Sequence, residues 1–108
     1  MITVHFITPP DGRLLGFHMG GHAGCGEAGQ DIVCAAVSSA AYLVANTVTE
    51  VLHVMPLSLD VGEGEMFLEI DMKDEPVCRP LLAGLKLHLV QLEEQYPDAI
   101  RVWYITDD

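Results

Sequence analysis

The sequence predicts a single α/β domain in which strands and helices follow the order β-β-α-β-β-α-β and form a two-layer sandwich. Three observations predict this fold. Apolar and polar residues alternate in five short segments, two long segments are apolar at helical spacing, and glycine or proline separates the segments. A chain of 108 residues is long enough for one two-layer core and too short for two. We therefore expect one domain over residues 1–108, with two helices covering a mixed or antiparallel sheet.

The first two strands are expected to form a hairpin. Residues 2–8 alternate, Pro9-Pro10-Asp11-Gly12 is a turn sequence, and residues 13–19 return as the second strand. Each strand has one apolar face, formed by Ile2, Val4 and Phe6 and by Leu15, Phe17 and Met19. His18 lies opposite the second of these faces, where exposure to solvent is favoured over a role in catalysis.

The apolar segment at residues 32–54 predicts a helix that ends before Pro56. Apolar residues cover nearly its whole circumference, so we expect it to be buried on more than one side. The sheet covers one side, and a second helix or a second subunit covers the other, which is the reason to expect a homodimer. The segment is apolar enough for a membrane span, but its interrupting polar residues favour a buried helix without membrane contact.

The second half of the chain predicts a second hairpin, a second helix and a fifth strand. Residues 57–61 and 65–72 predict a hairpin around Gly62-Glu63-Gly64. Its apolar residues are expected to point inward: Leu57, Leu59, Val61, Met66, Leu68, Ile70 and Met72. A helix with Cys78 on its core face should run from Asp74-Glu75-Pro76 to Tyr96-Pro97, and residues 100–106 predict the fifth strand.

Charge and cysteine content restrict the partners and the compartment. Sixteen acidic and five basic residues give a net charge of −11, which argues against direct nucleic-acid binding because phosphate contacts need Lys and Arg. A basic protein partner is favoured by long-range attraction, although solubility alone would also explain the charge. Three cysteines, an odd number, and the lack of a charged-plus-apolar leader predict a reduced, cytoplasmic protein.

The segment GGHAGCGEAGQDIVCAAVSS at residues 20–39 concentrates the chemically active residues. Its first half predicts a flexible loop because of Gly20, Gly21, Gly24, Gly26 and Gly29. Asp31 is the expected N-cap of the following helix, which would place Cys34 in the first turn, where the helix dipole favours thiolate. His22 lies twelve residues upstream and could exchange the proton, so His22 and Cys34 are a candidate dyad for acyl transfer. The alternative is an inert, buried cysteine.

Asp31 and Ser38 are candidate supporting residues. Asp31 either caps the helix, which its position favours, or orients the His22 imidazole as the third member of a triad. Ser38 lies four residues after Cys34 and therefore on the same helix face. Its hydroxyl either reaches the dyad or bonds to a helix carbonyl.

The runs GGHAG and GQDIVCAAVS resemble the signature of Prp, a family of ribosomal-processing cysteine proteases. The resemblance implies that His22 and Cys34 are the catalytic dyad, that Asp31 and Ser38 are the accompanying polar positions, and that the protein is an α/β sandwich and a homodimer. It also implies the substrate, because members remove a short N-terminal extension from the large-subunit ribosomal protein L-twenty-seven. Cys25 departs from the pattern, since a non-cysteine residue is expected there.

The sequence thus predicts a cysteine endopeptidase that acts on a ribosomal protein precursor without a metal or an organic cofactor. Two alternatives stay open. The first is a small zinc-binding or redox module with His22, Cys25, Cys34 and Cys78 as ligands, although their spacing lacks the paired pattern of zinc sites. The second is a non-catalytic ribosome-assembly factor that uses the acidic surface.

Overall fold

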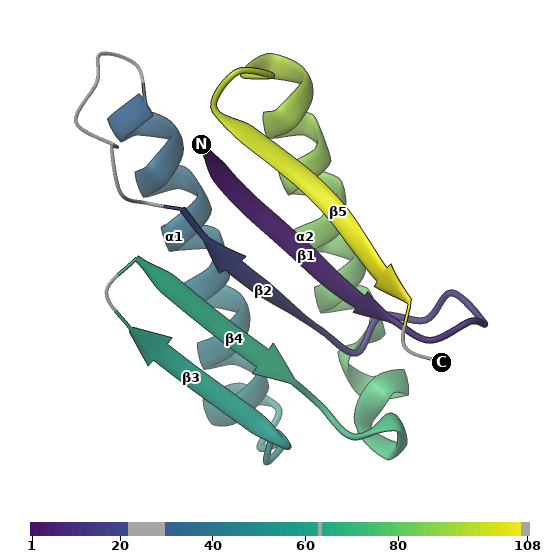
Figure 1. Ribbon diagram of the computed structural model, residues 1–108. Helices are drawn as coiled ribbons and strands as arrows, with labels where there is room; N and C mark the ends of the chain where they lie inside the picture. Colours follow the sequence, from purple (N-terminus) through teal and green to yellow (C-terminus); the bar gives the residue numbers. More distant parts are fainter. Residues whose placement is uncertain (22–29, 63, 107–108) are drawn as a thin grey trace.

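The structure, a computed structural model, describes residues 1–21, 30–62 and 64–106, except the side chains of 30–31 and 105–106 (Figure 1). The strands are β1 (Ile2–Thr8), β2 (Gly16–Gly20), β3 (Ser58–Gly62), β4 (Glu65–Glu69) and β5 (Ile100–Thr106). The helices are α1 (Gln30–Asn46) and α2 (Glu75–Gln95), with a π-helical turn at Thr47–Val51 and a 3-10 turn at Met72–Asp74. The predicted order of strands and helices is confirmed in the described residues.

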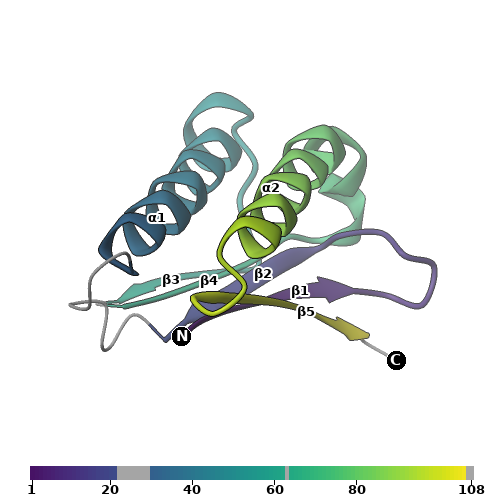
Figure 2. The same ribbon diagram turned by 90° about the horizontal axis from the view of Figure 1, so that it is seen from above.

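The described strands form one mixed sheet in the order β3-β4-β2-β1-β5. β1 runs parallel to β5 and antiparallel to β2, and the remaining pairs are antiparallel. Both helices lie on the same face of the sheet, and the described elements leave the opposite face open (Figure 2). The two-layer α/β sandwich is therefore confirmed.

The core lies between the helices and the sheet. Fully buried side chains come from the sheet and from both helices: Val4, Phe6, Phe17, Met66, Leu68, Val33, Val37, Leu82 and Leu89. Each such side chain contributes about 1.5–3 kcal/mol through removal of apolar surface from water. Cys78 is also buried in this cluster, as its position among the leucines of α2 predicted.

The apolar residues that were predicted to point inward from the second hairpin are not all buried, because four of them are exposed. Met66, Leu68 and Ile70 are buried, but Leu57, Leu59, Val61 and Met72 are exposed. β3 is the edge strand of the described sheet, so its side chains are covered less completely than those of β4. Met72 is exposed because the chain leaves β4 at Glu69 and enters the 3-10 turn.

The helix after the glycine-rich segment differs from the prediction at its end. Its last turn is a wide π turn that stops at Val51 rather than at Val54. The hydroxyls of Thr47 and Thr49 donate to the carbonyls of Leu43 and Ala45, at 2.6 and 3.1 Å. His53 then adopts a left-handed conformation with φ of 55°, which reverses the chain before Pro56 is reached.

The segment Ile32–Val51 is, by length and composition, apolar enough to cross a membrane. Core helices of water-soluble proteins meet the same criterion, and 39% of its most apolar window is buried inside the protein. Its remaining apolar side chains face outward, among them Ile32, Leu43 and Val51.

Candidate active site

Cys34 is the fifth residue of α1, because the helix begins at Gln30. The prediction that Asp31 is the N-cap is therefore wrong: its backbone lies inside the helix, and its side chain is outside the described residues. Gln30 is a better helix former than Asp, which explains the earlier start. Cys34 lies just past the first turn rather than within it, so the helix dipole favours its thiolate less than the sequence suggested.

The Cys34 side chain is nearly buried, with 9% of its surface exposed, at the edge of the hydrophobic core. Its sulfur is in a disulfide bond. A disulfide sulfur is not a nucleophile towards a peptide carbonyl, so any nucleophilic role of Cys34 belongs to the reduced protein.

The other half of the predicted dyad lies outside the described residues. His22, Gly24, Cys25, Gly26 and Gly29 all belong to residues 22–29. The His22–Cys34 dyad therefore stays a prediction from the sequence.

Two glycines of the glycine-rich segment, Gly20 and Gly21, lie within the described residues, at the end of β2. Gly20 is the last residue of β2 and is paired with Thr3, so the predicted loop begins after it. Gly21 has φ of 85°, and a Cβ there would collide with the carbonyl oxygen of Met1. Only glycine fits this turn. The end of β2 and the start of α1 lie at the same end of the sandwich (Figure 1).

A small cavity is lined by Ser38, which lies one helical turn after Cys34 on α1. Its volume is about 100 Å³, and we call it the site cavity; it is lined by Met19, Ser38, Tyr42, Gly62, Gly64, Glu65 and Met66. Cys34, Ser38 and Tyr42 recur every four residues and so form one stripe along the helix. The structure thus places Ser38 between the cysteine and the cavity, and it adds two polar residues that the sequence analysis missed, Tyr42 and Glu65.

Glu65 connects the site cavity with the open face of the sheet. Its Oε1 lies 4.0 Å from Nε2 of His18, and the side chains of His18 and Glu65 are 41% and 68% exposed. His18 therefore occupies the solvent-facing position that the strand pattern predicted. Helical spacing from Ser38 would have identified Tyr42, whereas Glu65 reaches the cavity only because the β3–β4 hairpin docks beside α1.

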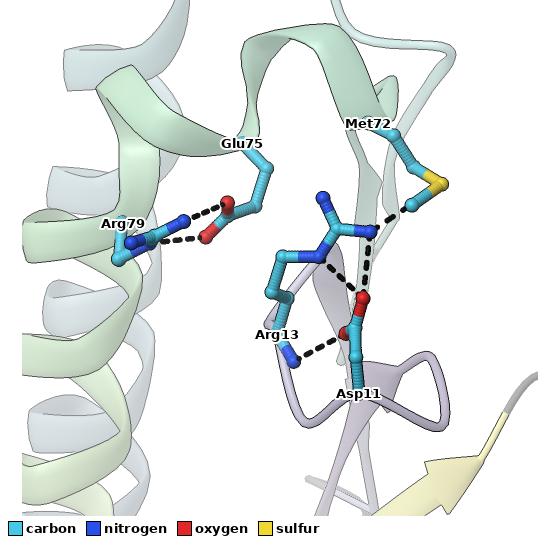
Figure 3. A network of polar contacts seen from close by, with 5 residues as sticks. All are labelled: Asp11, Arg13, Met72, Glu75 and Arg79. Carbon is cyan, nitrogen blue, oxygen red and sulfur yellow. Dashed lines mark hydrogen bonds and ion pairs between the residues drawn. The ribbon is translucent and has the colours of Figure 1, made fainter.

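A second, larger cavity lies elsewhere in the described part of the chain. It has a volume of about 600 Å³, lies between α2 and the β1–β2 turn, and is lined by Asp11, Arg13, Glu75, Arg79, Lys86 and Tyr104 among others. We call it the ion-paired cavity, because Figure 3 shows Asp11 bonded to Arg13 and Glu75 bonded to Arg79. Lys86 lies over the Tyr104 ring, 5.0 Å from its centroid.

The buried carboxylate of this cavity is fully satisfied. Glu75 is 1% exposed and accepts two hydrogen bonds from the Arg79 guanidinium, at 2.8 and 2.7 Å. These bonds lower the pKa of Glu75 below its usual range and outweigh the opposing effect of burial. The cavity therefore holds paired charges that stabilise the fold.

Cys78 and the described carboxylates do not form a metal site. Burial raises the pKa of the Cys78 thiol, which keeps it protonated and unreactive. Within the described ranges, no group of three or more His, Cys, Asp or Glu residues is placed to hold a metal ion. His22 and Cys25, two ligands of the proposed zinc site, lie outside those ranges.

Comparison with known proteins decides the family. The family model described as "Cysteine protease Prp" matches residues 1–101. The chain belongs to the cysteine protease Prp family. It is 36% identical over 98 residues to the Ribosomal processing cysteine protease Prp of Bacillus subtilis, a match that covers 85% of this chain and 87% of that protein.

Two crystal structures of Prp from Staphylococcus aureus have the same fold. One is a complex with a substrate peptide, with 26% identity, a TM-score of 0.87 and coverage of 97% of this chain and 100% of that chain. The other contains a covalently linked product peptide, with 27% identity, a TM-score of 0.84 and the same coverage. The chain is thus a cysteine protease with the fold of the Prp family.

Proposed function

We propose that the chain is the endopeptidase that removes the N-terminal extension of the large-subunit ribosomal protein L-twenty-seven during ribosome assembly. The observation that carries the proposal is the position of Cys34, at the N-terminal end of α1 and one helical turn from the site cavity. Family membership supports a protease, and the name of the curated relatives supports a ribosomal substrate.

The proposed reaction uses Cys34 and His22. His22 takes the thiol proton, and the Cys34 thiolate attacks the scissile carbonyl to give a tetrahedral oxyanion. His22 then returns the proton to the leaving amine, and a thioester forms. A water molecule, deprotonated by His22, attacks the thioester; the acid product leaves, and the thiol is regenerated. Backbone N–H groups at the start of α1 or in the glycine-rich segment stabilise the oxyanion.

Asp31 and Ser38 support this pair in the proposal. Ser38 lines the site cavity one turn after Cys34, where its hydroxyl can contact the substrate backbone or the dyad. Asp31 lies in the first turn of α1, three residues before Cys34, and its carboxylate would orient His22. The chain's own residues carry every step, so the mechanism needs no metal or organic cofactor.

The proposed enzyme is a cytoplasmic homodimer that contacts neither membrane nor nucleic acid. Exposed apolar residues on α1 and on the π turn that follows it, among them Ile32, Leu43 and Val51, support a second subunit. An apolar groove of about 550 Å³ between α1 and α2 lies on the same side. The net charge of −11 disfavours phosphate ligands and favours a basic protein substrate. Family membership argues against the zinc module and the non-catalytic assembly factor.

The decisive experiment mixes the reduced protein with the extended ribosomal precursor and measures product masses. We expect a shortened ribosomal protein with wild type, and a precursor of unchanged mass with Cys34→Ala. Brief reaction followed by acid quenching should also trap an adduct whose mass equals the enzyme plus the acyl fragment, attached at Cys34. A precursor that stays intact with the reduced wild-type protein would contradict the proposed function.

A further inference from the structure

The ion-paired cavity has no part in the proposed reaction. It lies between α2, the β1–β2 turn and β5, at the end of the sandwich away from the first turn of α1 (Figure 1). Its volume of about 600 Å³ falls within the range of about 300–1,000 Å³ that small-molecule sites occupy. Such sites are mostly apolar and contain a few polar groups that fix the orientation of the ligand. The groups that line this cavity therefore indicate which ligand it fits.

The cavity holds most of the positive charge of the chain. Three of the five basic residues line it, namely Arg13, Arg79 and Lys86, together with the carboxylates of Asp11 and Glu75. These groups leave a local net charge of +1, whereas the whole chain carries −11. At physiological ionic strength the Debye length is about 8 Å, so more distant carboxylates are largely screened. A monoanion is the ligand that balances the local charge.

Lys86 is the cation of this cavity that no carboxylate neutralises. Among the described residues, ion pairs involve Arg13 and Arg79 but not Lys86. The Lys86 ammonium lies instead over the Tyr104 ring, 5.0 Å from its centroid. The buried Phe6 stacks against the same ring, with 6.3 Å between the centroids, so the ring rests on the core. A carboxylate in the cavity would give Lys86 a charged hydrogen-bond partner.

The two arginines are held by their carboxylates and keep further donors. Arg13 contacts Asp11 through Nε and Nη2, and Arg79 contacts Glu75 through the same two nitrogens (Figure 3). Within the described part of the chain, neither Nη1 group takes part in these contacts. Each Nη1 carries two N–H donors. The arginines therefore supply positive potential to a ligand without losing their own partners.

The remaining walls of the cavity are apolar. Arg79, Ala83, Leu87 and Val90 form one stripe of α2, and Leu14 lies across from them on the β1–β2 turn. Leu87 is 61% exposed, so it offers apolar surface that the fold does not cover. From Arg79 to Val90 the helix rises about 16 Å, which is long enough for a ligand with a charged end and an apolar body.

We propose that the ion-paired cavity binds a small organic monocarboxylate with an apolar or aromatic body. The carboxylate accepts a hydrogen bond from the Lys86 ammonium, and Arg13 and Arg79 add positive potential. The body packs against Leu87 and Val90. The single charge follows from the net +1 of the cavity, and the apolar body follows from its walls. Binding at this place is separate from Cys34 and goes beyond the proposed cleavage.

The first test titrates the wild-type protein with three matched compounds and follows backbone amide signals by NMR. The probe is phenylbutyrate, phenylbutanol is its neutral analogue, and acetate carries the charge without the body. We expect phenylbutyrate to bind with a Kd of about 1 mM or below and to shift the signals of Lys86, Leu87 and Tyr104. The two reference compounds should bind at least about tenfold more weakly, because each lacks one of the two contacts.

The second test changes the protein. Lys86→Gln should weaken phenylbutyrate binding about tenfold, whereas Lys86→Arg keeps the charge and should restore most of the affinity. Lys73→Gln is the matched control, because Lys73 is exposed on the 3-10 turn and does not line the cavity. Leu87→Asn removes apolar surface from an exposed position and should weaken binding about threefold.

Three results would overturn the site. Equal affinities of phenylbutyrate and phenylbutanol for wild type would show that no anion is recognised. Equal affinities of Lys86→Gln and Lys73→Gln for phenylbutyrate would show that the placement of the charge has no effect. Signal shifts confined to the apolar groove between α1 and α2 would place the compound in another cavity. These measurements do not depend on precursor cleavage, so the proposed function and this site can fail separately.

Discussion

Two regions of the molecule differ in their content of acidic and basic residues. Residues 14–72, which include α1, β3 and β4, contain eight acidic residues and no basic ones. The rest of the chain contains the other eight acidic residues and all five basic ones. Its described ion pairs, Asp11–Arg13 and Glu75–Arg79, both lie at the ion-paired cavity, far from the Cys34 end of α1 (Figure 1, Figure 3).

We expect the ion-paired region to contribute to the stability of the fold and residues 14–72 to contribute to substrate binding. In the ion-paired region, the buried Glu75 carboxylate accepts two charge-assisted hydrogen bonds from Arg79 within the first turns of α2. In residues 14–72, the described ion contact is the 4.0 Å approach of His18 to Glu65, both exposed. Glu65 lines the site cavity, and under the proposed function the acidic residues of 14–72 attract a basic substrate towards it. Variants in the two regions should therefore affect different measurements.

Loss of the sulfur or the imidazole should have the largest effect. We expect Cys34→Ala and His22→Ala each to abolish precursor cleavage, because neither thioester formation nor proton exchange is then possible. Both variants should keep the fold, as judged by circular dichroism. The matched cysteine control is Cys78→Ser, which should keep its activity and lose about 1–3 kcal/mol of stability because a hydroxyl replaces a buried thiol. Residual thiol-dependent cleavage by Cys34→Ala would assign the nucleophile to another residue.

Reductant should have the next largest effect. Because the Cys34 sulfur is in a disulfide, protein isolated without reductant should cleave at least about tenfold more slowly than protein treated with dithiothreitol. Cys78 is free and buried, so Cys25 is the residue to replace. Cys25→Ser should be active without reductant, whereas Cys78→Ser should keep the dependence. Equal wild-type rates with and without dithiothreitol would argue against this control of the site.

The strands that are bounded by proline in the sequence, β1 and β5, could be predicted from it. The alternation of β1 and β5, together with Pro9 and Pro97, gave both strands with the observed bounds. Leu59 and Val61 of β3 share a face with the buried Leu68 and Met66 and yet are exposed, because periodicity shows which residues share a face and cannot show how completely that face is covered. The end of α1 was missed because His53 adopts a left-handed conformation that its residue type does not announce.

The candidate site was predictable only along one helix. Spacing of four residues placed Ser38 on the face of Cys34, and the same rule extends to Tyr42. Glu65 could not be found in this way, because its contact with the site cavity depends on how the β3–β4 hairpin docks beside α1. Asp favours the N-cap position, which is why the sequence predicts Asp31 there, but Gln30 already belongs to the helix.

Changes at the ion-paired cavity should affect stability and leave kcat unchanged. Arg79→Ala leaves the buried Glu75 carboxylate without its partner, whereas Glu75→Gln keeps a neutral acceptor and should cost about 1–2 kcal/mol. Arg79→Ala should therefore be the more destabilising of the two in urea unfolding.

The pH dependence of that stability follows from the lowered pKa of Glu75. A carboxyl whose pKa is lower in the folded than in the unfolded protein stabilises the fold above its ordinary value of 4.5. This stabilisation is lost as the pH falls through the lowered pKa. The difference in unfolding free energy between wild type and Arg79→Ala should thus be largest near neutral pH and shrink below about 4.5. A difference independent of pH would show that the pair does not act through the ionised carboxylate.

Removal of a single acidic charge beside the site should have the smallest effect, and it tests the contrast between the two regions most directly. Glu65→Gln should lower kcat/KM for the basic precursor about twofold at low ionic strength, because Glu65 is exposed at the site cavity. Glu94→Gln removes the same charge from the exposed end of α2 and should have no such effect. The difference should vanish as added salt shortens the Debye length to about 3 Å at 1 M. Equal losses for both variants would mean that total charge, rather than its placement around Cys34, attracts the substrate.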